Sequence, residues 1–340
     1  MSTPAPAAAP GGSRQLDRGE LERALAIVGR ISGAFRSRVV GQDSLQLSML
    51  VALMGDGHVL LESVPGLAKT TAAQTLADAV GGTFARIQCT PDLLPSDIVG
   101  TQVFEPAKAT FSTQLGPVHA NVVLLDEINR SSAKTQSAML EAMQERQTSI
   151  GGVVYKVPDP FIVMATQNPI EHEGTYELPE AQLDRFLVKE VIGYPHPAEE
   201  VEILDRVERR VFSTRLHRDH TVGMDDVRYL RHVVGRVYVD PAVKRYIVAL
   251  VHATRPPSPA LGELGHCVTA GASPRASIGF AQVARALAVL DGRTYAIPDD
   301  VHRLRYAVLR HRIVLNFDAV ADGVRPEQLV DAVFRSIPTP

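Results

Sequence analysis

Short runs of apolar residues recur five times between residues 58 and 192 and limit this 340-residue chain to few folds. They lie at residues 58–62, 84–89, 122–125, 161–165 and 186–192. Helical patterns, such as those at 69–80 and 132–145, separate some of them. A run that is apolar throughout is typical of a strand buried on both faces, and such strands form largely parallel sheets between helices. This part of the chain therefore predicts an α/β fold with helices on both faces of the sheet.

The pattern changes after Pro195-His196-Pro197, where strand-like runs give way to helical periodicity. Four helical patterns follow a polar stretch, at about residues 227–234, 243–251, 278–290 and 301–308. The length of the chain also favours about two domains. We therefore expect a disordered tail at 1–15, an α/β domain at 16–212, a linker at 213–221 and a small all-helical domain at 222–336.

Composition excludes several classes of protein. The 35 Lys and Arg residues against 38 Asp and Glu give a net charge of -3, which argues against a generally basic nucleic-acid binder. No apolar run approaches the roughly 18 residues that span a bilayer, and the Pro- and Ala-rich start does not resemble a signal peptide. Cys89 and Cys267 are too few for a disulfide framework, so we expect reduced core thiols. We expect a soluble, cytoplasmic protein without a membrane span.

The segment Ser63-Val64-Pro65-Gly66-Leu67-Ala68-Lys69-Thr70 lies between a predicted strand and a predicted helix, where a phosphate-binding loop would lie. Backbone N–H groups at the start of such a helix point at phosphates. Lys69 would neutralise phosphate charge, and the hydroxyl of Thr70 would reach Mg²⁺. An ordinary strand-to-helix turn is the alternative interpretation of this segment.

The segment departs from the phosphate-loop pattern G-x-x-x-x-G-K-[ST] at both glycine positions. Ser63 and Ala68 stand there, and Gly66 is the flexible point nearby. If position 63 requires a positive φ, its side chain costs about 1 kcal/mol. We therefore expect that Ser63 could weaken nucleotide binding.

Two acids and one asparagine follow later apolar runs. Asp126 and Glu127 come directly after the run at 122–125, at the strand end where open α/β sheets bind ligands. Asp126 would hold Mg²⁺, and Glu127 would orient or polarise an attacking water. Asn168 follows the run at 161–165 and would hydrogen-bond that water or the γ-phosphate. The alternative for all three is an ordinary turn or helix cap.

With these motifs the chain resembles the AAA+ ATPases and, within them, the MoxR family. The resemblance extends over roughly residues 20 to 335 and rests on several ordered motifs. These are residues 64–70, 90–97, 126–130, 134–137, 140–145, 165–169, 178–186 and 271–275. It implies an AAA+ P-loop nucleotide domain followed by a helical lid, assembled as a hexameric ring of identical chains with ATP between neighbouring subunits.

The resemblance also implies roles for individual residues. Lys69 and Thr70 correspond to Walker A, Asp126 and Glu127 to Walker B, and Asn168 to sensor 1. The expected metal ligands are thus Thr70 and Asp126. The expected nucleotide-binding residues are Val39, Val40, Gln42, Val64, Pro65, Gly66, Leu67, Ala68, Lys69, Thr70 and Thr71.

Two arginines complete the implied site. Arg185 stands where the family has its arginine finger, which reaches the γ-phosphate of a neighbouring subunit, and Arg275 resembles sensor 2 on the lid. A guanidinium suits either place because it stays charged and can bridge two phosphate oxygens. Surface or interdomain salt bridges are the alternative roles. Arg130 is the second candidate for the arginine that acts on a neighbour.

The leading functional hypothesis is Mg²⁺-dependent ATP hydrolysis coupled to remodelling, maturation or metal-cofactor insertion of a protein partner. The resemblance suggests a von Willebrand factor A domain protein as that partner. A nucleic-acid motor is one alternative, because arginines cluster at positions 303, 305, 310 and 312 and between 206 and 218. A nucleotide-gated scaffold with little turnover is another, suggested by Ser63. The complete set of Asp126, Glu127, Asn168 and Arg185 argues against a scaffold.

Overall fold

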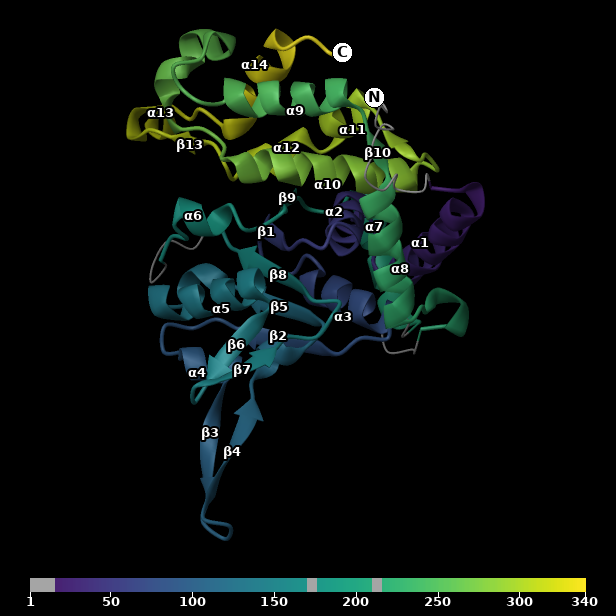
Figure 1. The fold of residues 1–340 in the computed structure, drawn as a ribbon, viewed down its shortest axis with the longest axis vertical. Coiled ribbons are helices and arrows are strands. Elements are labelled where there is room, and N and C mark those ends of the chain that lie inside the picture. Colours follow the sequence, from purple (N-terminus) through teal and green to yellow (C-terminus); the bar gives the residue numbers. More distant parts are fainter. Residues whose placement is uncertain (1–15, 170–175, 210–215) are drawn as a thin grey trace, which may run out of the picture.

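Figure 1 shows the computed structural model, which describes residues 16–169, 176–209 and 216–340. The predicted tail at residues 1–15 and residues 213–215 of the predicted linker lie outside the described residues. Among the described helices, none combines the length and the apolar character that a bilayer crossing requires.

The five apolar runs form one five-stranded sheet. Its strands, in spatial order, are β2 (Phe84–Gln88), β5 (Val122–Asp126), β8 (Ile162–Gln167), β1 (Val59–Ser63) and β9 (Val188–Ile192). Every neighbouring pair is parallel, which confirms the parallel sheet predicted from the sequence. All five strands therefore end at the same edge, where the predicted site residues follow β1, β5 and β8.

Alternate residues of the central strands enter two separate cores. Val122 and Leu124 pack on one face, while Val123 and Leu125 pack on the other. The first face is covered by α1 (Arg18–Arg38), α2 (Asp43–Met54) and α3 (Lys69–Ala79), and the second by α4 (Pro95–Val99) and α5 (Ala133–Glu145) (Figure 1). Burial on both faces explains why these strands show no polar alternation in the sequence.

Two hairpins extend the α/β domain. Strands β3 (Gly100–Glu105) and β4 (Thr110–Leu115) project away from the body (Figure 1). Strands β6 (Gln147–Ile150) and β7 (Val153–Lys156) form a second hairpin around the Gly151-Gly152 pair. Gly151 and Gly152 have φ values of 57° and 80°, which a two-residue hairpin turn of this kind requires. Short helices η1 (Pro117–His119), η2 (Ile128–Arg130), α6 (Glu180–Leu183) and the longer α7 (Pro197–Glu208) complete this part.

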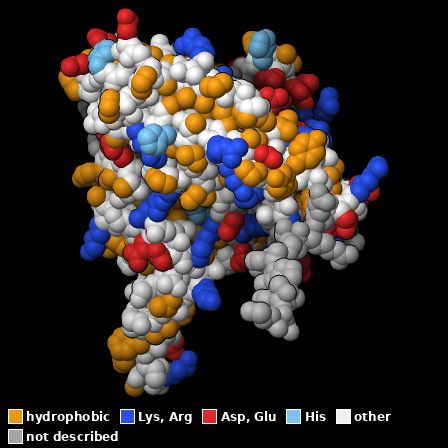
Figure 2. Space-filling view, turned by 45° about the horizontal axis from the view of Figure 1, so that its top comes forward, with side chains coloured by type: hydrophobic (Ala, Val, Ile, Leu, Met, Phe, Trp, Pro, Cys, Tyr) orange, Lys and Arg blue, Asp and Glu red, His pale blue; other side chains and the backbone are white. Residues whose placement is uncertain are grey.

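The lid that follows is helical, as predicted. Its helices are η4 (Arg218–His220), α8 (Met224–Arg236), α9 (Pro241–Ala253), η5 (Pro259–Cys267), α10 (Pro274–Leu290), α11 (Pro298–Arg303), α12 (Arg305–Leu309), α13 (Phe317–Ala321) and α14 (Pro326–Ser336). Helix α10 lies at the centre, with Phe280, Val283 and Leu287 fully buried. Figure 2 turns the lid end toward the viewer, where hydrophobic side chains gather with Lys and Arg side chains between them.

The lid also contains two short strand pairs that the sequence did not indicate. They join β10 (Tyr238–Val239) to β12 (Tyr295–Ala296) and β11 (Val268–Ala270) to β13 (Val314–Leu315). Strands of two or three residues are too short to show a periodicity of two. The predicted core thiols Cys89 and Cys267 are both buried and unbridged.

Candidate active site

The loop between β1 and α3 turns through two left-handed residues. Gly66 has a φ of 86° and Ala68, the residue before α3, a φ of 52°. Ser63 instead ends β1, and its φ is not positive. Position 63 therefore does not require a positive φ, and the condition for strain at Ser63 is not met, because the loop departs from the strand only after this residue. The cost of a side chain in the left-handed region falls on Ala68.

A cavity of about 350 Å³ opens beside this loop at the carboxyl edge of the sheet. Nine predicted site residues line it: Pro65, Gly66, Leu67, Ala68, Lys69, Thr70, Thr71, Asp126 and Glu127. Arg86 and Gln88 of β2 line it as well, and the sequence analysis missed them. They are alternate polar residues inside an apolar run, which was the available signal that one face of β2 borders a polar site.

Lys69 lies at the start of α3 and is half-buried beside the two acids. Its Nζ atom donates to the carbonyl oxygen of Val64 at 3.4 Å. Burial lowers the pKa of Lys69, and the charges of Asp126 and Glu127 oppose that shift. The cavity thus holds one lysine opposite two carboxylates, a set of charges suited to a phosphate chain with a cation.

Both carboxylate oxygens of Asp126 accept hydrogen bonds. Its Oδ1 atom accepts from the Thr166 hydroxyl of β8 at 2.9 Å, and its Oδ2 atom accepts from Arg86 Nη2 at 2.6 Å. The backbone N–H of Glu127 donates to the same Thr166 hydroxyl at 2.8 Å. Thr166 therefore fixes both acids relative to β8, a role that its place directly after an apolar run did not reveal.

Glu127 faces the cavity with two polar partners. Its Oε2 atom accepts from Gln88 Nε2 and from Arg130 Nη1, both at 3.2 Å. Asn168 is buried directly after β8, which lies between β5 and β1. It shares the edge with the acids but does not line the cavity.

Of the residues expected near the base of the nucleotide, Gln42 contacts the chain just after β9. Val39 is partly buried against the core, and the side chain of Val40 is buried. Gln42 Nε2 donates to the carbonyl oxygen of Gly193, just after β9, at 3.5 Å. Because β9 neighbours β1, this segment lies at the same edge of the sheet as the phosphate loop.

Arg185 and Arg275 lie in a different cavity from the phosphate loop. They line a second cavity of about 230 Å³, together with His58, Gln144 and Arg312. His58 precedes β1 and Arg185 precedes β9, so this cavity is at the amino edge of the sheet. The two edges are separated by the length of β1, which has 5 residues. At about 3.3 Å per residue, this length is about 16 Å. The structure thus brings these two arginines together but not with their own phosphate loop.

Neither arginine is neutralised by an acid. Across the described residues, Arg185 and Arg275 take part in no ion pair, and the buried Nε atom of Arg185 has no hydrogen-bond partner. Arg275 Nη2 donates to the amide oxygen of Gln144 at 3.4 Å. Arg130, in contrast, forms an ion pair with Glu127 at the carboxyl edge.

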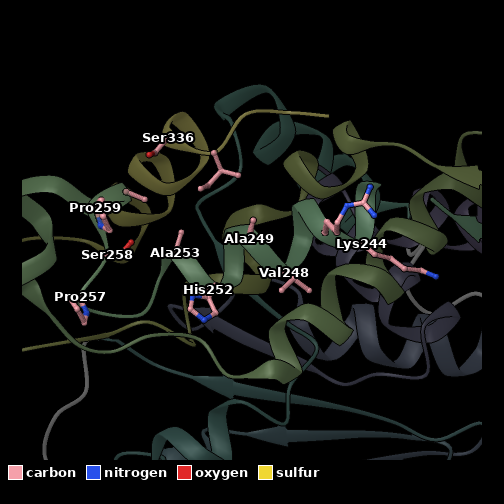
Figure 3. A pocket seen from close by; sticks show the side chains of 12 residues that line it. Lys244, Val248, Ala249, His252, Ala253, Pro257, Ser258, Pro259 and Ser336 are labelled. Carbon is pink, nitrogen blue, oxygen red and sulfur yellow. The ribbon is translucent and has the colours of Figure 1, made fainter. Parts of the chain in front are cut away.

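A third, more voluminous cavity has different chemistry. It measures about 760 Å³ and lies in the lid between α9, η5 and the end of α14 (Figure 3). Its lining is mainly apolar, as at Val248, Ala249 and Pro257, and it includes none of the predicted site residues. Size alone therefore does not identify the nucleotide site, whereas the charges around the phosphate loop do.

The lid arginines that suggested a nucleic-acid motor are paired with acids. Arg303 pairs with Asp291, Arg305 with Asp331, Arg310 with Glu327 and Arg312 with Asp184. These pairs offset positive charge on the lid that a phosphate backbone would need. In the second cluster, Arg206 pairs with Glu202, whereas Arg210 and Arg215 lie outside the described residues.

Comparisons with known proteins agree with this geometry. The ATPase family associated with various cellular activities (AAA) matches residues 58–188, and the AAA lid domain matches residues 265–333. The chain is similar to the chaperone MoxR1 of Mycobacterium tuberculosis, with 48% identity over all of this chain and 88% of the relative. It is 31% identical to the protein MoxR of Methylorubrum extorquens, over 89% of this chain and 92% of that protein.

A solved structure shows the same fold. The crystal structure of a Cytophaga hutchinsonii protein described as an ATPase superposes with a TM-score of 0.84 and 40% identity, covering 95% of this chain and 96% of its own. The fold, the phosphate loop with its acids and these relatives lead to one conclusion. This chain belongs to the MoxR family of AAA ATPases.

Proposed function

We propose that this ATPase works as a ring of identical chains, six by analogy with AAA+ rings, in which each nucleotide lies between two neighbours. The observation that carries the proposal is the separation of the site residues onto two edges of one sheet. Lys69, Asp126 and Glu127 lie at the carboxyl edge, while Arg185 and Arg275 lie about 16 Å away, at about 3.3 Å per strand residue. Two arginines that line one cavity and form no ion pair with any residue that the structure describes are suited to a phosphate brought by another chain.

At the carboxyl edge, each side chain has a task in phosphoryl transfer. The backbone of residues 65–68 and Lys69 would bind the phosphates, and Val39, Val40 and Gln42 would border the base. Glu127 would orient the attacking water, with Asn168 beside it. Arg185 and Arg275 of the adjacent chain would stabilise the charge that develops on the γ-phosphate.

The donors at this edge also fit Mg²⁺. Thr70 is exposed at the start of α3, and the Asp126 carboxylate borders the same cavity. Hydroxyl and carboxylate oxygens are the ligands that Mg²⁺ prefers, so these two residues would hold it. When bound, the ion neutralises charge on the phosphate oxygens.

We propose a chaperone-like role for the hydrolysis. The similarity to a protein named chaperone MoxR1 supports this role, since that similarity covers the whole chain. The energy of ATP would remodel or mature a protein partner or assist insertion of its metal cofactor, and a von Willebrand factor A domain protein is the proposed class of partner. The paired lid arginines give the nucleic-acid alternative no support.

The first experiment measures Mg²⁺-dependent ATP hydrolysis and sedimentation for the wild type and for Lys69→Ala, Glu127→Gln and Arg185→Ala. We expect hydrolysis in the wild type, ATP-dependent assembly, and loss of turnover in all three variants. Nucleotide binding and assembly without turnover would favour the scaffold instead.

A mixing experiment tests whether Arg185 acts on a neighbour. Glu127→Gln chains have an intact Arg185, and Arg185→Ala chains have an intact Glu127. In rings that contain both, some interfaces combine two intact halves, so we expect hydrolysis to return on mixing. Two inactive variants that stay inactive when mixed, although they assemble together, would contradict the shared site.

A further inference from the structure

Arg312 of the lid is a buried charge that the proposed site does not use. It follows α12, and only 3% of its side chain is exposed. Its Nε atom donates to Asp184 Oδ1 at 2.7 Å, and its Nη2 and Nη1 atoms donate to the carbonyl oxygens of Phe186 at 2.6 Å and Leu187 at 3.2 Å. One lid side chain thus binds the residues on both sides of Arg185.

Asp184 joins this segment to the helix that carries Arg275. Its second oxygen, Oδ2, accepts from the hydroxyl of Ser273 at 2.6 Å. Ser273 is the N-cap of α10, and its side chain also accepts from the backbone N–H of Arg275 at 3.0 Å. The Asp184 carboxylate therefore connects the backbone around Arg185 with the first turn of the Arg275 helix.

His311 adds a second link from the lid. Its ring is buried, and Nε2 lies 3.1 Å from the carbonyl oxygen of Phe186. Burial and the adjacent Arg312 charge lower the pKa of His311 well below its usual value, so the ring is neutral and Nε2 is assigned as the donor. Figure 1 shows the lid lying against α6 and β9, between which this segment runs.

If the lid moved alone, the buried guanidinium of Arg312 would lose its partners in the α/β domain. A buried guanidinium is tolerated only when its donors are satisfied, and leaving one unpaired is strongly destabilising. Besides the carbonyl oxygen of Val308 within the lid, the partners of Arg312 come from Asp184, Phe186 and Leu187. The segment around Arg185 is therefore expected to follow the lid.

We propose that Arg312 is a positioning residue that, through Asp184 and the backbone of residues 184–187, sets Arg185 and Arg275 against the nucleotide of the neighbouring chain. This inference rests on the proposed function, in which those two arginines act across the ring interface. It adds that a change in the lid of one chain alters hydrolysis in the next chain.

Arg312→Met is the test variant because methionine fills similar apolar space, and the Asp184 carboxylate, which loses this ion pair, keeps the hydroxyl of Ser273 as a donor. We expect ATP binding within about twofold of the wild type and a kcat lower by about 10- to 100-fold, the cost of a small misplacement of a reacting group. Arg310→Met is the matched control. Arg310 lies nearby in the lid but pairs with Glu327 and contacts no residue of the segment 184–187. The kcat of the Arg310→Met variant should therefore equal that of the wild type.

Mixed rings separate positioning of Arg185 from a general loss of structure. When Arg312→Met chains are mixed with Glu127→Gln chains, hydrolysis should return. In a random one-to-one ring, about one quarter of the interfaces then combine an intact Glu127 with a correctly positioned Arg185. When Arg312→Met chains are mixed with Arg185→Ala chains, hydrolysis should not return, because both variants lack the same half of the site. Asp184→Asn, which keeps the shape of the side chain, should behave as Arg312→Met does and provides a second variant.

The outcomes distinguish this inference from the proposed function. If Arg185→Ala and Glu127→Gln restore each other but Arg312→Met and Glu127→Gln do not, Arg312 serves its own chain and the inference is wrong. An Arg312→Met variant with wild-type kcat would also overturn it. If Arg185→Ala and Glu127→Gln fail to restore each other in shared rings, the shared site itself is wrong, and the inference falls with it.

Discussion

Ala68 and Glu127 are two non-glycine residues held in the left-handed region at the same site, with φ values of 52° and 57°. A side chain in this region costs about 1–2 kcal/mol. Each residue directly precedes a helix that follows a strand, α3 after β1 and η2 after β5. The turns direct the side chains of Lys69 and Glu127 at the cavity. For Ala68 the effect is to aim the start of α3 and Lys69 at the phosphate position.

The strain at Ala68 leads to a stability prediction. Ala68→Gly should raise the free energy of unfolding by up to about 1 kcal/mol, because glycine adopts this conformation without a clash of its Cβ atom. Denaturant unfolding of the purified variant measures the change. The matched control is Ala138→Gly in the right-handed interior of α5, which should lower the free energy by about 1 kcal/mol. A less stable Ala68→Gly variant would contradict the argument.

A buried histidine makes stability depend on pH. The Nδ1 atom of His58 accepts from the backbone N–H of Val163 at 3.0 Å, and burial lowers the pKa of its ring to about 3. The folded protein keeps this ring neutral, while the unfolded chain binds a proton below about pH 6.5. His58 thus contributes stability that is complete above pH 6.5 and is lost as the pH falls toward 3.

The expected slope from His58 is about 1.4 kcal/mol of unfolding free energy per pH unit below pH 6.5. His58→Asn should flatten the fall, although it lowers stability at neutral pH. Denaturant unfolding at several pH values between 7 and about 5 measures the slope. Exchange of His232, which is exposed on α8, to Asn is the control and should leave the slope unchanged. An equal slope in His58→Asn and the wild type would refute the assignment.

At the scale of the elements, the projecting hairpin depends on close backbone contact at its base. Gly100 begins β3 with a φ of 111°, and a Cβ atom there would lie 2.3 Å from the carbonyl oxygen of Gln114. Farther out, Phe104 and Phe111 pair at 5.2 Å between ring centroids but remain exposed. The attachment of the hairpin therefore depends on its base rather than on the aromatic pair.

Gly100→Ala should destabilise this attachment by roughly 2–3 kcal/mol, because the new Cβ atom meets backbone on the opposite strand and the φ is unfavourable. Faster hydrogen exchange of the β3 and β4 amides would report the local loss. Gly193→Ala, where a Cβ atom meets no heavy atom within 4 Å, is the control and should exchange like the wild type. Unchanged protection of β3 and β4 in Gly100→Ala would show that the base relaxes freely.

At the scale of the whole molecule, the two halves of the proposed site belong to opposite edges of the sheet, and the lid lies against only one of them. A folded single chain therefore presents an incomplete site at each edge. Completing it requires a second copy in a head-to-tail arrangement, which closes into a ring when the rotation between copies is suitable. Activity should then depend on association as well as on folding.

The specific activity of the wild type should consequently fall on dilution below the dissociation constant of the ring, because separated chains lack Arg185 at their phosphate loops. A series of ATPase assays across protein concentrations, with sedimentation at the same concentrations, tests this. Excess Arg185→Ala chains or excess Glu127→Gln chains, added at low protein concentration, should each restore part of the activity, because every wild-type chain then forms one interface with two intact halves. Excess chains that carry both substitutions should not restore it. Constant activity per chain over the whole series would contradict a shared site.

Much of the fold and of the phosphate site follows from local pattern. Apolar runs such as 122–125 predict buried parallel strands because burial on both faces removes polar alternation. Asp126, Glu127 and Asn168 could be assigned to one edge because parallel strands all end there. Arg86 and Thr166 were missed, since their contacts to Asp126 depend on which strands are neighbours and in what register.

Sequence alone therefore predicted the parallel sheet and most residues that line the cavity at the phosphate loop, because both depend on local patterns, and it indicated the family through motifs spread over residues 20 to 335. Only the tertiary structure decided that the strain falls on Ala68 rather than Ser63, and that Arg185 and Arg275 share a cavity away from their own phosphate loop. It also showed that Arg312 reaches across 128 positions to Asp184. Such contacts arise from the packing of the lid against the sheet, which no local periodicity encodes.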